Sequence, residues 1–192
     1  MAKKHEFRPD KPRTSLLQHL LLTKQQQKTV LKWTLYAVVL LVISVVQDVL
    51  LSPVRIFGAT TELVPCTIIL ICLLEGSHSS SIFALIASLL YLFSGTAPGP
   101  YSMVAITFLS IAASIIRQAF LQEGFFAAFL CCAAAMVLYE LVNFAFGLFL
   151  ALTPFGHIHA FLITAAISLL AVPVLYPVLK AISTTGGPSW KE

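Results

Sequence analysis

The sequence predicts an all-α polytopic membrane protein, a bundle of six transmembrane helices preceded by a basic amphipathic helix. Of its 192 residues 58% are hydrophobic and 10% are charged, and the mean hydropathy is +0.92. These values lie outside the range of soluble globular domains. The apolar residues are gathered in six runs separated by Gly, Pro, Ser and Thr. At about 20 residues per crossing, the length accommodates six helices and leaves no room for a separate soluble domain.

The six runs cover residues 33–51, 62–75, 81–95, 101–118, 125–150 and 160–180. The second and third are shorter than a usual crossing, so a re-entrant pair or a single merged span is the alternative. With six spans and a cytoplasmic N-terminus, every Lys and Arg except Arg55 lies on the cytoplasmic side. Merging the two short runs would export Arg117, or Lys180 and Lys191, against the positive-inside rule. We therefore expect six separate spans with both termini in the cytoplasm.

The N-terminal segment carries much of the positive charge. Its charged part is too long for a signal peptide, and no cleavage site of small residues follows it. Four leucines between residues 16 and 21 recur at helical spacing, with Lys24 and Lys28 downstream. This pattern predicts a basic amphipathic helix on anionic lipid, with docking of a cytoplasmic protein as the alternative and nucleic-acid binding not expected. The predicted organisation is a cytoplasmic tail over 1–32, a six-helix bundle over 33–182 and a second tail over 183–192.

Three acids fall in or beside the apolar runs. A rise of 1.5 Å per residue puts Glu140 roughly 22 Å from the cytoplasmic start of the fifth span, in the outer half of the bilayer. Asp48 and Glu62 lie near the outer ends of the first and second spans, whereas Arg117 lies at the opposite face. The basic groups at the level of the acids are Arg55, His157 and His159. An unpaired central charge costs about 2.5–3.5 kcal/mol, so we expect Glu140 to be neutral or hydrogen-bonded within the bundle.

The helix around Glu140 indicates where this side chain points. Helical spacing places on one face a strip of mostly small residues: Cys132, Ala133, Met136, Glu140, Asn143 and Gly147. Small residues allow helices to approach closely, and Glu140 and Asn143 can then hydrogen-bond across the contact. We expect a polar clasp between helices, and contact with a ligand or partner, or proton transfer, stays open.

The sequence carries no recognisable catalytic motif. It has no G-x-S-x-G, no H-E-x-x-H and no pair of aspartates spaced within the spans. The four cysteines lie in spans without a metal-site spacing, and we expect them to be small packing residues. His157 and His159 lack further ligands and indicate an interfacial loop. We therefore expect neither an enzyme nor a bound cofactor or metal.

Several segments, in their order along the chain, resemble the MreD family of bacterial rod-shape proteins. They read QDVLLSP, LVPCTIILICLLEG, IFALIASLLYLFSGTAPGPYSM, RQAFLQEGFFAAF, VLYELVNF and LYPVLKAIS, and together they cover about residues 40 to 182. In that family an acid followed by a Pro-containing loop ends the first span, as Asp48 and Pro53 do here. The entry to the second span matches Glu62 to Pro65, and the acid of the fifth span matches Glu140. Members often carry an Asp near the end of the third span, where this chain has Leu92.

The resemblance implies a non-enzymatic scaffold in the bacterial inner membrane. Such a protein would dock the single transmembrane helix of MreC, and would work with MreB, RodA and a class B penicillin-binding protein in lateral wall synthesis. Docking would occur helix in groove within the bilayer, through packing and hydrogen bonds. The residues expected to hold the bundle or the partner are Glu140, Asn143, Asp48, Glu62 and Arg117.

The alternative function belongs to another class, the substrate-binding component of an energy-coupling-factor vitamin transporter. Those proteins also have six helices with both ends inside, and they bind their ligand from the outer side. The acids Asp48, Glu62 and Glu140 fit such a ligand site. No clear Ala-x-x-x-Ala pair of the kind that docks the transporter's energising partner is present, which favours the scaffold.

Overall fold

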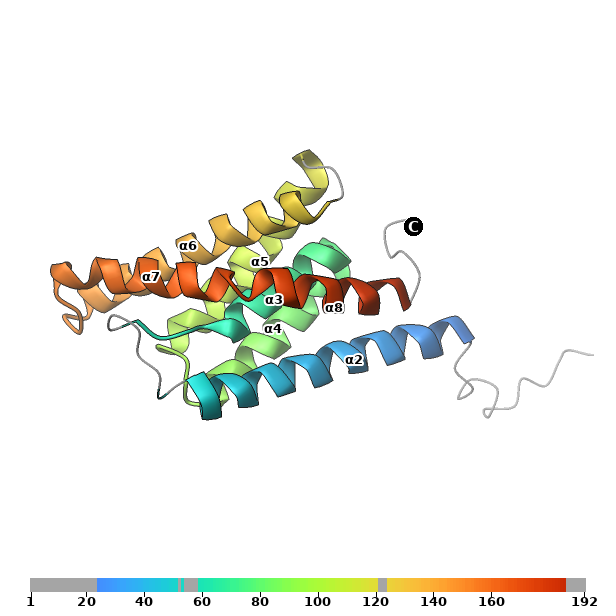
Figure 1. The fold of residues 1–192 in the computed structure, drawn as a ribbon, viewed down its shortest axis with the longest axis horizontal. Helices are drawn as coiled ribbons and strands as arrows, with labels where there is room; N and C mark the ends of the chain where they lie inside the picture. Colours follow the sequence, from blue (N-terminus) through green and yellow to red (C-terminus); the bar gives the residue numbers. More distant parts are fainter. Residues whose placement is uncertain (1–23, 52, 54–58, 121–123, 186–192) are drawn as a thin grey trace, which may run out of the picture.

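The chain is all-helical in the part that the structure describes (Figure 1). The computed structural model describes residues 24–51, 53, 59–120 and 124–185, and these contain no β-strand. The helices are α2 (Lys24–Val46), extended by the π-helical turn η1 (Gln47–Leu51), then α3 (Leu63–Glu75), α4 (Ser77–Phe93), α5 (Pro100–Phe120), α6 (Phe125–Phe149), the 3-10 turn η2 (Phe155–His157), α7 (Ile158–Leu169) and α8 (Val172–Thr185). Each predicted apolar run is therefore helical.

Three helices are long and apolar enough to cross a membrane: Gln26–Leu51, Pro100–Ala119 and Phe125–Phe149. The pair Phe155–Leu169 and Val172–Thr185 gives a fourth candidate if it is one broken span. Helices α3 and α4 are apolar but shorter, and the 13 residues of α3 rise only about 20 Å. Helix length thus gives three to four candidate spans and does not confirm six.

The run predicted at 160–180 is not one straight helix. The chain breaks after Leu169, and the two flanking helices are bent by 47°. Pro173 lies in the first turn of α8, where its missing N–H costs no hydrogen bond, but it cannot continue the ladder of α7. Helix α8 also runs on to Thr185, past the predicted end of the bundle at residue 182.

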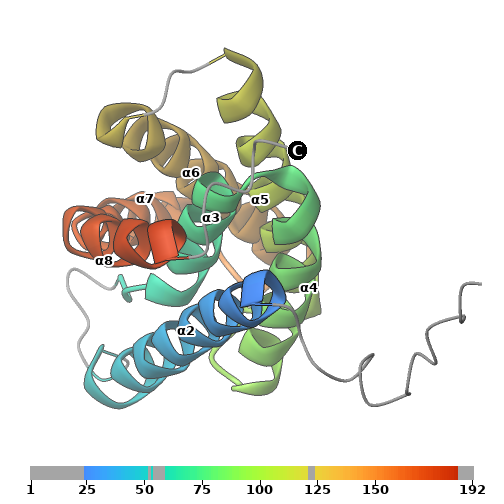
Figure 2. The same cartoon turned by 90° about the vertical axis from the view of Figure 1, so that its right-hand side faces the viewer.

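Helix α3 forms the centre of the molecule. The end-on view shows the other helices arranged around it (Figure 2), and every residue from Val64 to Glu75 is buried. A helix that is apolar on all sides is stable only when protein or lipid covers every side. The apolar sequence of α3 is therefore satisfied by its neighbours, which include α2, α4, α5, α6, α7 and α8.

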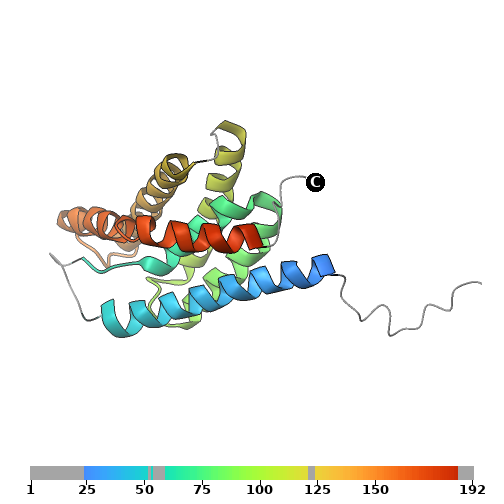
Figure 3. The same ribbon diagram turned by 45° about the vertical axis from the view of Figure 1, so that its right-hand side comes forward.

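Helix α3 begins inside the bundle and not at its end. The backbone N–H of Glu62 donates to Ser168 Oγ at 2.9 Å, and Ser168 lies ten residues along α7 from Ile158. Ten residues of helix rise about 15 Å. Residues 60–62 are not helical, and Ala59 is buried. A non-helical stretch of chain thus enters the bundle to roughly half its depth, which Figure 3 shows in teal just before α3.

The N-terminal helix is continuous across residue 32, where we expected the cytoplasmic tail to end. Helix α2 starts at Lys24 and runs into the bundle without a break. The rest of the predicted amphipathic helix lies outside the described residues, as do Arg55 and residues 186–192. Helix α2 begins at the same end of the bundle at which α8 ends (Figure 1, right).

Candidate functional site

Two groups of buried polar side chains lie at the two ends of α3. The lysine cluster, at the C-terminal end of α3, consists of Lys32, Tyr36, Glu75 and Arg117. The acidic cluster, at the N-terminal end of α3, consists of Asp48, Glu62, Tyr91, Tyr139, Glu140 and Asn143. The two clusters differ in how many of their polar atoms have hydrogen-bond partners among the described residues.

The lysine cluster satisfies its carboxylate from the protein itself. Lys32 Nζ lies 2.6 Å from Glu75 Oε2, and both side chains are at most 5% exposed. The Tyr36 hydroxyl donates to Glu75 Oε1 at 2.7 Å. Arg117 donates to the carbonyl of Leu73 in the last turn of α3, where helix carbonyls lack intrahelical partners. These contacts tie α2 and α5 to the C-terminal end of α3.

The sequence did not point to Lys32 or Glu75 as a pair. The cytoplasmic tail predicted over 1–32 includes Lys32, whereas this side chain is 4% exposed and lies in the core. The signals that could have found the pair are the lone acid at the end of the wholly apolar α3 and a lysine one helical turn before Tyr36. Arg117 was singled out, and it lies at this end of α3, away from Glu140.

The acidic cluster brings together the four other residues that the sequence singled out. Glu140 and Asn143 lie on α6 and are 1% and 2% exposed, so they face the protein interior. Glu62 immediately precedes α3 and is also buried. Asp48 lies in η1 and is half-buried. The predicted strip on α6 is indeed an interior face, because its members from Cys132 to Gly147 are buried or half-buried.

Two tyrosines complete this cluster, and sequence reasoning missed both. The hydroxyls of Tyr91 and Tyr139 lie close enough to the Glu62 carboxyl group to interact with it. The Asn143 amide is in the same position relative to the Glu140 carboxyl group. Tyr91 also lies within electrostatic reach of Asp48, Glu62 and Glu140. Tyr139 directly precedes Glu140, and Tyr91 is the only polar side chain in the last turns of α4 before Ser94.

Most polar atoms of the acidic cluster lack a hydrogen bond of normal geometry. Seven of its buried atoms have no such partner in the described part of the chain: Asp48 Oδ1, Glu62 Oε2, Tyr91 OH, Tyr139 OH, Glu140 Oε1, Asn143 Oδ1 and Asn143 Nδ2. A buried polar group left unsatisfied costs about 1–3 kcal/mol. The members of the acidic cluster thus leave several of their own polar atoms without a hydrogen bond of normal geometry, unlike Glu75 in the lysine cluster.

The backbone at the start of α3 is satisfied by side chains from other helices. The N–H of Val64 donates to Gln47 Oε1 at 2.9 Å, and the N–H of Glu62 donates to Ser168 Oγ. The Glu62 side chain forms no capping bond to its own helix. Because Gln47 and Ser168 supply the capping bonds, the Glu62 carboxyl remains directed at the cluster.

Among the described residues, the cysteines and histidines do not join these acids in a metal-binding group. Cys66 and Cys132 lie with their sulfurs 3.8 Å apart in the core between α3 and α6, and both are free thiols. His157 and His159 are exposed at the start of α7. Among the described residues, no group of three or more His, Cys, Asp or Glu side chains could hold a metal ion.

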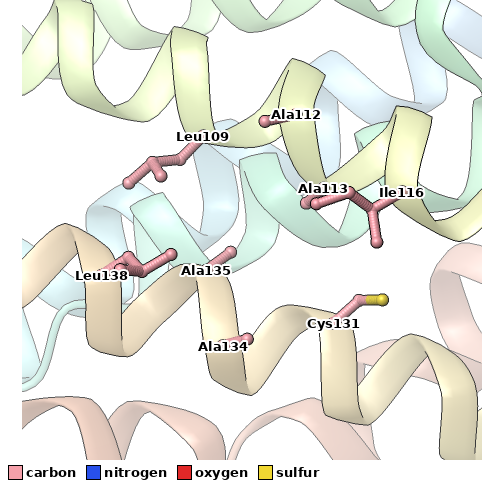
Figure 4. Close-up of a pocket in the computed structure, with 8 residues that line it drawn as sticks. All are labelled: Leu109, Ala112, Ala113, Ile116, Cys131, Ala134, Ala135 and Leu138. Carbon is pink, nitrogen blue, oxygen red and sulfur yellow. The ribbon is translucent and has the colours of Figure 1, made fainter.

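A separate apolar groove lies between α5 and α6 (Figure 4). Its hollow has a volume of about 90 Å³. Small side chains form its floor, flanked by larger aliphatic ones, and the lining residues are Leu109, Ala112, Ala113 and Ile116 of α5 with Cys131, Ala134, Ala135 and Leu138 of α6. A groove with a floor of small residues allows another helix to approach closely.

A scan against protein-family models, a search of curated proteins and a search of solved structures each found no match to this chain.

Proposed function

We propose that the protein is a non-enzymatic membrane scaffold of the bacterial cell-shape machinery. It crosses the inner membrane six times, keeps both termini in the cytoplasm, and docks the transmembrane helix of an MreC-like single-span protein. MreB, RodA and a class B penicillin-binding protein are the further partners. The proposal builds on the ordered segments that resemble the MreD family and on the groove between α5 and α6.

The groove is the observation that carries the docking mechanism. Lipid gives no hydrophobic drive for helix association, so a partner helix is held by close packing. Alanines in the groove, such as Ala112 and Ala134, let a partner backbone approach, while the flanking Ile116 and Leu138 are half exposed and available for contact. The lining is apolar, so a transmembrane helix is an occupant of matching chemistry.

Six crossings are compatible with the short helices because α3 has little contact with lipid. Its surface is covered by other helices along its length, and its two ends carry the polar clusters. The ion pair of Lys32 with Glu75 joins the start of α2 to the end of α3, so these helices run antiparallel. Similarly, the rings of Tyr101 and Phe146 stack with their centroids 4.7 Å apart. This contact joins the start of α5 to the end of α6, so these two helices also run antiparallel.

Filling the groove tests the proposal. We expect Ala134→Trp to lower co-purification of the MreC-like partner about tenfold or more, which corresponds to about 1.4 kcal/mol of lost binding free energy. Ala145→Trp is the matched control, because Ala145 is an exposed residue of the same helix outside the groove. Partner recovery should be measured at equal membrane levels of each variant. Equal recovery with both variants would remove the groove from the docking mechanism.

The acidic cluster favours a second candidate, the vitamin-binding component of an energy-coupling-factor transporter. Its polar atoms that lack partners in the described residues are buried, and they would offer hydrogen bonds to a small polar ligand. A tightly bound vitamin released from the purified protein and identified by mass spectrometry would select this candidate. Recovery of an MreC-like partner without any ligand would select the scaffold.

A further inference from the structure

We propose that the acidic cluster is a binding site for a small ligand that carries a primary ammonium group. The proposal does not depend on the scaffold function, because the cluster and the groove between α5 and α6 share no residue. It rests on unpartnered buried atoms, on the kind of atoms these are, and on the irregular backbone that meets at the cluster.

The first step is that the described residues leave the cluster incomplete. Glu140, Asn143, Tyr91 and Tyr139 are at least nine-tenths buried, and each has a polar atom without a hydrogen bond in the described residues. Native proteins satisfy nearly all such atoms with protein, water or a ligand. The carboxylate of Glu75 in the lysine cluster shows how this chain satisfies a buried acid when it uses its own side chains.

The second step concerns the charge and chemistry of the occupant. Three of the unpartnered atoms are carboxylate oxygens, from Asp48, Glu62 and Glu140, and a fourth is the Asn143 amide oxygen. Acceptors therefore predominate, and a donor-rich cation complements them. The described residues place no three metal-ligating side chains around one point. An ammonium group reaches acceptors through three N–H bonds of about 2.8–2.9 Å, so it fits more widely spaced oxygens than a metal ion does.

The third step is that irregular backbone converges on the cluster. The non-helical residues before Glu62, the π-helical turn that contains Asp48 and the break between α7 and α8 adjoin one another, as the bonds of Ser168 and Gln47 to the start of α3 show. In membrane proteins, non-helical backbone at this depth is tolerated where it is buried in protein or lines a cavity, and broken helices frequently frame ligand sites. Local π-turns are also concentrated at functional sites.

The binding test uses the full-length protein in nanodiscs of phosphatidylcholine and phosphatidylglycerol, which contain no primary ammonium. Ethanolammonium chloride is titrated while the thermal unfolding midpoint is followed, with ethylene glycol as a neutral analogue of similar size and sodium chloride as the ionic control. We expect a saturable rise of about 2–4 °C with ethanolammonium and none with the two controls. No saturable rise, or an equal rise with sodium chloride, would overturn the proposal.

Two variants locate the site. Glu140→Gln and Glu62→Gln each remove one carboxylate and keep its shape, so either variant suffices if the other does not fold. Each should lower the apparent affinity for ethanolammonium at least tenfold, whereas Glu75→Gln in the lysine cluster should leave it unchanged. Unchanged affinity in both cluster variants would contradict the assignment. Since each variant is compared with its own unliganded midpoint, differences in basal stability do not enter.

A last arm distinguishes a free amine from a lipid headgroup. The titration is repeated in nanodiscs that contain phosphatidylethanolamine. A midpoint already raised, with no further response to ethanolammonium, identifies the lipid headgroup as the source of the ammonium. A response that persists identifies a free amine, and both results support an ammonium site.

Discussion

Glu75 and Glu140 are both buried carboxylates in an apolar bundle, yet their surroundings are opposite. Glu75 has a lysine on one oxygen and a tyrosine hydroxyl on the other. Glu140 has Asn143 beside it but keeps an unpaired oxygen, and it lies within electrostatic reach of the second acid Glu62. A buried carboxylate paired with a lysine holds helices in place, whereas a carboxyl group that is only 1% exposed and keeps an oxygen without a partner in the described residues indicates a site that something else completes.

We expect Lys32→Met to be strongly destabilising, because it leaves Glu75 buried without its cation. Removal of one partner of a buried ion pair costs about 3–5 kcal/mol. Lys28→Met is the matched control, since Lys28 lies one turn earlier on α2 and is exposed, and we expect it to change the free energy of unfolding by less than about 0.5 kcal/mol. Denaturant unfolding in the same detergent measures both. If the two variants were equally stable, the ion pair would not hold α2 to α3.

Replacement of buried acids in the acidic cluster should have the reverse effect on the empty protein. In the absence of ligand, Glu140→Gln replaces a buried carboxyl group that has one oxygen without a partner among the described residues. We expect the variant to be at least as stable as the parent protein, since the amide is cheaper to bury than the carboxylate. The unliganded unfolding midpoint measures this. A large loss of stability would show that the carboxylate itself holds the bundle, as the polar-clasp interpretation of the sequence requires.

At the scale of the elements, the joint between α3 and α4 is a single residue. Gly76 ends α3 and begins α4 with φ of 88°, a conformation that side chains with a Cβ rarely adopt. A Cβ there would also lie 2.5 Å from Gln118 Nε2 on α5. Gly76 thus permits both the sharp reversal of the chain and the close approach of α5.

We expect Gly76→Ala to destabilise the protein by more than Gly95→Ala. Both substitutions force a side chain into positive φ, at a cost of about 1–2 kcal/mol, but Gly95 has nothing within 4 Å of the added methyl group. The excess measures the clash with Gln118. Gly124→Ala, with an extended backbone and open space, is the neutral control. Equal losses for Gly76→Ala and Gly95→Ala would show that Gln118 moves away freely.

The positions of the elements were predictable because each apolar run is bounded by strong breakers. Four of the six runs begin and end close to observed helices, and the first lies within the longer helix formed by α2 and η1. Pro173 indicates the break in the sixth run. The apolar residues on both sides of it nevertheless make the run look continuous in the sequence. The burial of Glu140 and Asn143 followed from helical spacing, since a face of small and polar residues is unsuited to lipid.

Two features of the sites could not be read from the sequence. Lys32 and Glu75 are 43 positions apart, and only the tertiary fold joins them. Glu62 lies inside the bundle because the residues before α3 enter it without helical structure, and a count of residues along the chain does not reveal this. Both features arise from the central position of α3, which no local pattern determines.

At the scale of the whole molecule, the other helices form a ring around α3. The ring covers a helix too short to span a bilayer by itself, the two ends of that helix carry the lysine and acidic clusters, and the groove between α5 and α6 is open to a partner. The proposed six crossings require α3 and α4 to cross the membrane as separate spans. If they formed a re-entrant pair, the turn around Gly76 would not reach the side on which α2 begins.

The most direct test of this claim is the sidedness of the α3–α4 turn. In a background with the four native cysteines replaced by alanine, single cysteines are placed at the exposed residues Ser79 and Lys28 and at the half-buried Thr96. They are labelled with a membrane-impermeant thiol reagent from each side of sealed vesicles. The account predicts that Ser79→Cys reacts from the same side as Lys28→Cys, and that Thr96→Cys reacts from the opposite side. Reaction of Ser79→Cys from the same side as Thr96→Cys would contradict six crossings and the architecture built on them.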